Sequence, residues 1–194
     1  MGRPAGGADP GGYCPAVIFS PTDLPGVTLV DLERREDERG YFARTWCQRE
    51  FGAAGLSDRL VQASVSYNRR RGTLRGLHYQ TEPHGEDKLV RCTRGAVWDV
   101  VIDLRPDSPT RLRHHAVELR ADTGRALFIP AGLAHGFQTL EDDTEVFYQM
   151  SEFYVPAAAR GVRWNDPLFG ISWPFALPIL HPRDAAYPDF HPLA

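Results

Sequence analysis

The chain of 194 residues has few cysteines, no long apolar run and no large excess of charge of either sign. Cys14, Cys47 and Cys92 are widely spaced and form no CxxC pair, which argues against a disulfide framework or a structural zinc site and favours the reducing cytoplasm. No apolar stretch approaches the ~20 residues that a membrane-spanning helix needs. With 22 Lys and Arg against 25 Asp and Glu, the net charge of −3 argues against a broad cationic surface for nucleic acid.

Glycine and proline, by contrast, are abundant, with 18 and 16 residues. They exceed the average share of about 12% without reaching the composition of low-complexity chains. Many turns are therefore expected. The length fits one domain, which we place at residues 16–194, and the Gly- and Pro-rich residues 1–15 are expected to form a disordered tail.

Short β-prone runs recur along the chain at intervals of roughly 8–12 residues, with turn residues between them. This spacing is typical of an all-β sandwich or barrel. A short helix is expected at 48–58, and the Pro-rich segment 173–194 carries enough apolar residues, from Phe175 to Phe190, to pack on the barrel. The expected strands are 27–30, 60–65, 89–93, 96–104, 114–119, 126–129, 136–140 and 144–150.

Two histidines, His78 and His135, lie on either side of the strand-rich centre of the sequence. On neighbouring strands of a small barrel both can point inward, because side chains alternate with period two. They could then bind a metal, form a hydrogen-bonded part of the core, or act in catalysis as neutral imidazoles. A metal site needs about three ligands, but Gln80 stands where a His-x-His pair would continue, and His84 and Glu86 are expected on a loop.

Four further polar residues are candidates whose position the pattern alone leaves open. Lys88 begins an expected strand and either stabilises an oxyanion from inside the barrel or lies on its surface. Tyr148 lies in a strand with apolar groups on both faces, so alternation does not place it inside the barrel. Arg39 and Arg75 each precede a glycine, where a close backbone favours a phosphate or carboxylate ligand, or else they are ordinary surface arginines.

Six segments, taken in order over residues 25–190, resemble the dTDP-4-dehydrorhamnose 3,5-epimerase family of cupin-type sugar-nucleotide enzymes. The resemblance implies an all-β fold, a cupin-type double-stranded β-helix (jelly roll) with a few short peripheral helices. The segments are DERGYF at 37–42, GTLRGLHYQ at 72–80, KLVRC at 88–92, WDVVIDLR at 98–105, IPAGLAHGF at 129–137, and RWNDP at 163–167 with GISWP at 170–174.

The resemblance also implies a reaction, the epimerisation of a dTDP-4-keto-6-deoxyhexose at C3 and C5 in deoxysugar biosynthesis, for rhamnose or for a secondary-metabolite sugar. The C4 ketone acidifies the neighbouring C–H bonds, so the site needs a base, an acid on the opposite face and a donor for the enolate oxygen. By resemblance His78 is the base, Asp184 orients it, Lys88 polarises the ketone and Tyr148 is the acid. Asp166, the rival partner of His78, is interpreted as structural.

No metal or other cofactor is implied, because proton transfer leaves the redox state unchanged. The resemblance implies a homodimer in which residues 25–45 exchange strands with the partner subunit. The sequence departs from the family at Arg44 and Arg183, where Glu and Lys are usual, and at Ser64 or Val65, where an Asn is frequent. The residues expected to bind substrate are Arg39, Phe42, Gln62, Arg75, His135, Tyr154 and Arg183, with Arg39 reaching in from the partner and Tyr154 stacking on the base.

Three alternatives remain open from the sequence. A single-carbon epimerase, acting at C3 or at C5, would use the same scaffold. A non-catalytic cupin could bind a sugar nucleotide for regulation or assembly, although such a protein has no need for an acid and a base on opposite faces. A metal-dependent cupin oxygenase or isomerase would contain stoichiometric metal.

Overall fold

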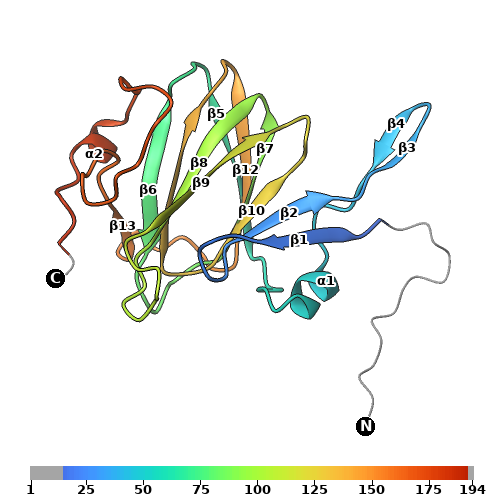
Figure 1. Cartoon of the computed structure of the whole chain (residues 1–194), viewed down its shortest axis with the longest axis horizontal. Coiled ribbons are helices and arrows are strands. Elements are labelled where there is room, and N and C mark those ends of the chain that lie inside the picture. Colours follow the sequence, from blue (N-terminus) through green and yellow to red (C-terminus); the bar gives the residue numbers. More distant parts are fainter. Residues whose placement is uncertain (1–14, 192–194) are drawn as a thin grey trace, which may run out of the picture.

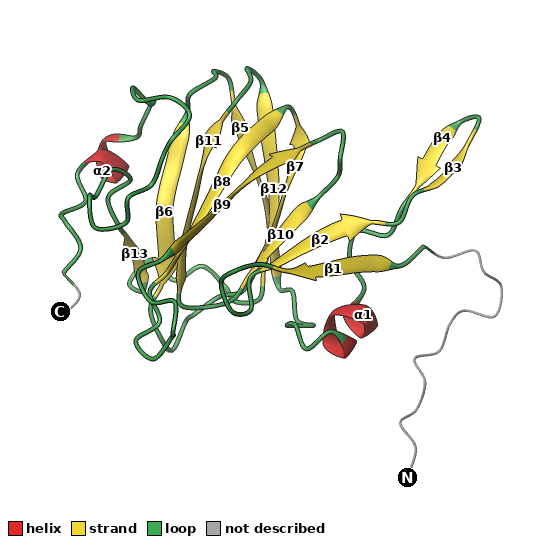
Figure 2. Cartoon of the chain, viewed as in Figure 1, coloured by secondary structure: helices red, strands yellow, loops and turns green. Residues whose placement is uncertain are grey.

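The fold consists of two antiparallel β-sheets that face each other, with loops and short helices around them (Figures 1 and 2). The structure, a computed structural model, describes residues 15–191. One sheet has six strands in the order β1-β2-β10-β7-β12-β5, and the other has five in the order β13-β6-β11-β8-β9. This arrangement confirms the predicted all-β jelly roll.

The six-stranded sheet contains β1 (Val17–Pro21), β2 (Thr28–Leu32), β5 (Gln62–Asn68), β7 (Lys88–Arg94), β10 (Ala126–Ile129) and β12 (Thr144–Met150). The five-stranded sheet contains β6 (Leu74–Gln80), β8 (Ala96–Asp103), β9 (His114–Arg120), β11 (Leu133–Thr139) and β13 (Ala159–Gly161). A separate hairpin is formed by β3 (Arg35–Asp37) and β4 (Gly40–Phe42), and the helices are α1 (Gln48–Ala53) and α2 (Pro182–Ala185).

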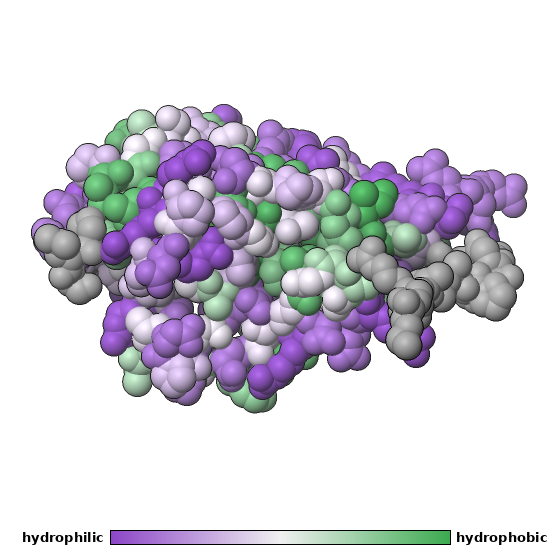
Figure 3. Space-filling view, turned by 60° about the horizontal axis from the view of Figure 1, so that its bottom comes forward, coloured by the Kyte–Doolittle hydropathy of each residue, from purple (hydrophilic) through white to green (hydrophobic). Residues whose placement is uncertain are grey.

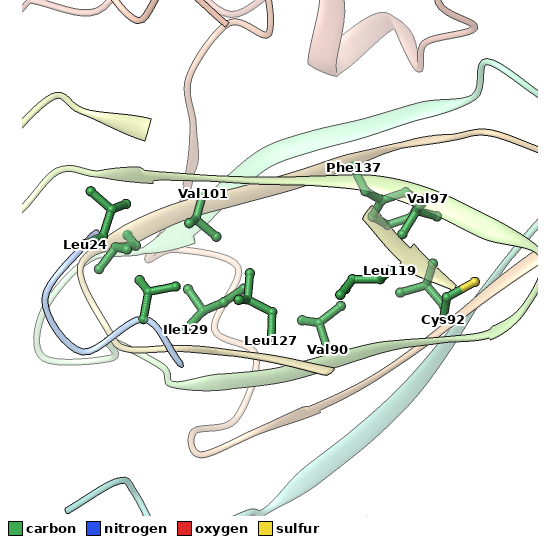
Figure 4. Packing of buried hydrophobic residues seen from close by; sticks show 12 residues of the cluster. Leu24, Val90, Cys92, Val97, Val101, Leu119, Leu127, Ile129 and Phe137 are labelled. Atoms are coloured by element: carbon green, nitrogen blue, oxygen red, sulfur yellow. The ribbon is translucent and has the colours of Figure 1, made fainter. Parts of the chain in front are cut away.

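The main core lies between the two sheets (Figure 4). Val90 and Leu127 of the six-stranded sheet belong to the same buried cluster as Val101 and Phe137 of the five-stranded sheet. Side chains of alternating residues leave a strand on opposite faces, so a strand covered on both sides must be apolar on both. This explains the nearly continuous apolar run of β8, in which both faces are buried.

The outer face of each sheet is covered by a different part of the chain. Phe51 of α1 packs with Leu89 and Phe128 on the six-stranded sheet. The C-terminal segment covers the five-stranded sheet, where Phe190 is part of the cluster, so its packing on the barrel is confirmed. The prediction was wrong for Leu177, which is 92% exposed on the Pro-rich loop.

On the face that Figure 3 shows, hydrophilic residues predominate and hydrophobic residues form separate groups between them. Within residues 15–191, no helix is long and apolar enough to cross a membrane.

Several element boundaries differ from those expected. The predicted helix 48–58 ends at Ala53, because Gly55 has φ of 74° and the N–H groups of Gly55 and Leu56 donate to Gly52 and Phe51 in a Schellman motif. The strand expected at 136–140 begins earlier, at Leu133, which places His135 inside β11. β1 and α2 were not predicted. β1 begins with a β-prone apolar run, Val17 to Phe19, that was not read as a strand, whereas α2 lies in a Pro-rich segment without a helical pattern.

The expected disordered tail at 1–15 lies outside the described residues except for Pro15, which is buried. The expected strand exchange over 25–45 concerns a partner subunit and stays a prediction. Within this chain β2 pairs with β10, and the β3–β4 hairpin projects from the body of the fold (Figure 1).

Candidate active site

A cavity of about 660 Å³ opens between the two sheets, beside the apolar core. Its wall is built by β5, β7 and β12 of one sheet, β6 and β11 of the other, and the segment around α2. The four residues predicted to be catalytic all line it, and so do three of those predicted to bind substrate, Arg75, His135 and Arg183. The fold therefore brings together residues that are far apart in the sequence.

His78 and Asp184 form a hydrogen-bonded pair in this cavity. Nε2 of His78 lies 2.8 Å from Oδ1 of Asp184, although 106 residues separate them. α2 carries Asp184 inward, where it is 3% exposed, and the Gly76 N–H donates to its second oxygen at 3.3 Å. Burial alone would raise the pKa of Asp184, but the hydrogen bond and charge of His78, the Gly76 N–H and Arg183 lower it below the usual range. The carboxylate is thus ionised and fixes the imidazole ring.

A second His–Asp pair lies next to the first. His135 is opposite His78 in the register of β11 and β6. Its Nε2 is 2.9 and 3.1 Å from the two carboxylate oxygens of Asp99, which is completely buried in β8. Asp99 was not predicted. Its signal was a carboxylate within the apolar run 96–104, one of two there with Asp103, because a buried charge requires a partner.

Lys88 points inward, which answers the question that the sequence left open. The side chain of Lys88 is 10% exposed, and its Nζ is 2.7 Å from Oε1 of Glu86. This ion pair was not predicted. Tyr148, half-buried on β12, lines the cavity from the opposite sheet to His78. A group bound between the sheets would therefore meet His78 on one side and Tyr148 on the other.

Arg75 and Ser66 add polar groups to the cavity wall. The Nε of Arg75 donates to Oδ1 of Asn68 at 2.7 Å, and its guanidinium is exposed. The hydroxyl of Ser66 is buried and has no hydrogen-bond partner among the described residues. Such a hydroxyl is available to a ligand.

A second cavity of about 340 Å³ adjoins the first and shares His78 and Arg183 with it. Tyr154 lines this second cavity and is exposed. The backbone N–H of Tyr154 donates to Oε1 of Gln62 at 2.7 Å, so these two predicted nucleotide contacts lie together. Arg183 lies between the cavities, with Nη2 at 3.5 Å from Nε2 of His78.

Arg39 and Phe42 are not brought to the cavity of their own chain. Both lie on the projecting β3–β4 hairpin, where Arg39 pairs with Asp37 and Phe42 is 62% exposed. Asp166, the rival partner of His78, accepts hydrogen bonds from the backbone N–H groups of Leu168 and Phe190, which fits its interpretation as structural. Within residues 15–191, no group of three or more His, Cys, Asp or Glu is placed to hold a metal ion.

Comparisons with known proteins place this chain in a family. A family model described as dTDP-4-dehydrorhamnose 3,5-epimerase matches residues 21–192. Proteins with this description from Sinorhizobium fredii and Shigella flexneri are 39% and 41% identical, cover 89% and 84% of this chain, and are themselves matched over 89% and 90% of their lengths. A dTDP-4-dehydrorhamnose 3-epimerase from Streptomyces niveus is 39% identical, with 84% of this chain and 79% of that protein covered.

A crystal structure of the dTDP-4-dehydrorhamnose 3,5-epimerase from Bacillus anthracis, with TDP and PPi bound, has a TM-score of 0.88 to this chain. Its sequence identity is 37%, and the match covers 90% of this chain and all of that one. The jelly roll and its cavity, together with these matches, define an epimerase of the isomerase class. The chain belongs to the dTDP-4-dehydrorhamnose 3,5-epimerase family. The predicted family, fold and enzyme class are confirmed.

Proposed function

We propose that this epimerase acts on a dTDP-4-keto-6-deoxyhexose at C3 and also at C5, with His78 as base and Tyr148 as acid. The observation that carries the mechanism is the placement of the His78–Asp184 pair and Tyr148 on opposite sheets around one cavity. Epimerisation needs this geometry, because a proton leaves one face of the ring and another returns to the opposite face.

Each step of the proposed reaction conserves atoms and electrons. His78 takes the proton from the carbon next to the ketone, and the electron pair of the C–H bond moves to the C4 oxygen as an enolate. Lys88 and His135, both on the cavity wall, stabilise this oxygen. Tyr148 then donates its proton to the carbon from the other face, and solvent restores both groups.

The nucleotide is proposed to lie along the rim of the cavity. Arg75 binds the diphosphate, Gln62 and Tyr154 contact the nucleoside, and Arg183 lies between sugar and nucleotide. The relative from Bacillus anthracis binds TDP and PPi, which supports a nucleoside diphosphate as ligand.

We also propose a cytoplasmic homodimer in which Arg39 and Phe42 of the projecting hairpin reach the partner's cavity. The expected assay result is loss of TDP affinity in Arg39→Ala, and light scattering would report the mass of the dimer.

The test of the function is proton NMR of dTDP-4-keto-6-deoxyglucose with the protein in D₂O. Deuterium at both C3 and C5 supports the double epimerase, and loss of this exchange in His78→Ala supports His78 as the base. Deuterium at C3 alone favours a single-carbon epimerase. This alternative is tested because the relative from Streptomyces niveus is named a 3-epimerase. No exchange at either carbon contradicts the proposal. Activity that requires added metal would also contradict it.

A further inference from the structure

Asn68 lies at the end of β5, beside the cavity rim, and is 2% exposed. Its Nδ2 donates to the backbone oxygens of Ser66 and Thr144 at 3.1 and 3.2 Å. Because a carbonyl oxygen only accepts, these two contacts fix the orientation of the amide. Oδ1 of Asn68 must then face Arg75, and it accepts from the Nε of Arg75 at 2.7 Å.

This contact restrains an otherwise exposed arginine. Arg75 has no carboxylate partner within residues 15–191, and its other hydrogen bond runs from Nη2 to the Tyr67 backbone oxygen at 3.5 Å. Fixing Nε orients the planar guanidinium of this cavity-lining residue, and its N–H groups without another hydrogen bond are available to a ligand in the cavity. A planar fork of donors suits the oxygens of a phosphate.

Two other arginines show what the amide partner changes. The Nε of Arg105 donates to Asp103 at 2.9 Å, and the Nε of Arg125 donates to Asp31 at 2.7 Å. In both pairs a carboxylate neutralises the guanidinium. At Arg75 the same Nε position is held by a neutral amide, so the positive charge stays available to an anion.

We propose that Asn68 is a positioning residue for the diphosphate: it preorganises Arg75 without neutralising it. The proposal rests on the proposed function in that the ligand is a nucleoside diphosphate. Preorganisation strengthens binding because less conformational freedom of the side chain is lost when the ligand arrives. Asn68 therefore acts on affinity through Arg75 and touches no reacting atom.

The test is a double-mutant cycle with Asn68→Ala and Arg75→Ala, in which isothermal titration calorimetry measures the affinity for TDP and for thymidine. We expect Asn68→Ala to raise the Kd for TDP about tenfold, or about 1.4 kcal/mol. The Kd for thymidine, which has no phosphate, should stay unchanged. In the Arg75→Ala background the second substitution should change the Kd for TDP by less than about twofold, because its partner is already absent.

Asn68→Asp tests the role of charge. It keeps an acceptor for the Nε of Arg75 but adds a negative charge, and it loses the Nδ2 donor that faces the Ser66 and Thr144 oxygens, so it should also weaken TDP binding. If the alanine variant does not fold, as judged by its Tm, Asn68→Ser replaces it in the cycle, because a hydroxyl can still donate to a backbone oxygen. Higher affinity for TDP in Asn68→Asp would contradict the argument about charge.

Three results would overturn the proposal: an unchanged Kd for TDP in Asn68→Ala, an equal loss for thymidine, or an equal loss in the Arg75→Ala background. The last two would show a merely structural role. TDP lacks the keto-hexose that is epimerised, so the cycle reports on phosphate binding whether or not the wild type exchanges deuterium. Failure of the proposed function appears instead in the D₂O assay.

Discussion

Replacing Asp184 by Asn tests the His78–Asp184 pair with little change in shape. In the native protein both carboxylate oxygens accept hydrogen bonds, one from His78 at 2.8 Å and one from the Gly76 N–H at 3.3 Å. An Asn side chain has one oxygen and one NH₂ group, so it cannot accept from both partners. Either Gly76 faces a second donor, or the amide donates to His78 and the other tautomer of the imidazole is favoured.

The size of the effect follows from the lost hydrogen bond. A hydrogen bond to a charged group contributes about 1.5–3 kcal/mol. If that contribution is lost only in the transition state, kcat falls roughly 10- to 150-fold, since each ~1.4 kcal/mol changes a rate tenfold. If the tautomer changes as well, the nitrogen facing the substrate carries a proton and cannot act as a base, and the loss extends to about 10⁴-fold.

The assay is the rate of deuterium incorporation at C3 at saturating substrate, with the Kd for TDP and the Tm measured in parallel. The expected result is a large fall in kcat with TDP affinity within about threefold of wild type, because the carboxylate faces the base and not the nucleotide. Asp166→Asn is the matched control, since Asp166 is also buried but its carboxylate accepts, among residues 15–191, only from backbone N–H groups. It should lower the Tm and leave kcat nearly unchanged. A fall in kcat of less than threefold in Asp184→Asn, or an equal fall in the control, would refute the reasoning.

The remaining predictions concern stability and reactivity. Gly76→Ala should lower the free energy of unfolding in urea by about 2–4 kcal/mol, because a Cβ would lie 2.7 Å from the Gly136 Cα. At Gly40, which also has a positive φ, a Cβ would meet open space, so Gly40→Ala should lower the free energy of unfolding by less. Equal losses in the two variants would contradict a steric clash at Gly76. Asp103 is buried, and although burial raises its pKa, hydrogen bonds from Arg105 and from two nearby hydroxyls hold that pKa well below the usual range. The contribution of Asp103 to stability is present above about pH 4 and is lost as the pH falls further. The free energy of unfolding of Asp103→Asn, measured by urea titration, should therefore depend less on pH below about pH 4 than that of the wild type. The same pH dependence in both proteins would count against this. Burial raises the pKa of Cys92 to about 11, so mass spectrometry should find it unmodified by iodoacetamide at pH 8 until the protein is unfolded; rapid labelling of the native protein would contradict this.

Much of the strand pattern was predictable because it depends on local composition. Apolar runs between turn residues located β7, β8, β9, β10 and β12 within a residue or two of their observed bounds. β1 carries the same kind of local signal, the run Val17–Phe19, and was missed. The short helix α2 in the Pro-rich C-terminal segment could not be found in this way, because it is stabilised by packing with distant parts of the chain. For α2 this meant that Asp184 was assigned by family resemblance and not by any local signal.

The sequence by itself determined the types of side chain available for catalysis and the segments that carry them. It did not determine their pairing. Whether His135 bonds to Asp99, Lys88 to Glu86 or Arg75 to Asn68 depends on which residues of separate strands lie opposite each other and on which face they project. A shift of one residue in register would turn His135 to the other face of its sheet. That register is decided by the packing of the two sheets as a whole, so only the tertiary structure could show which acids, bases and arginines act together.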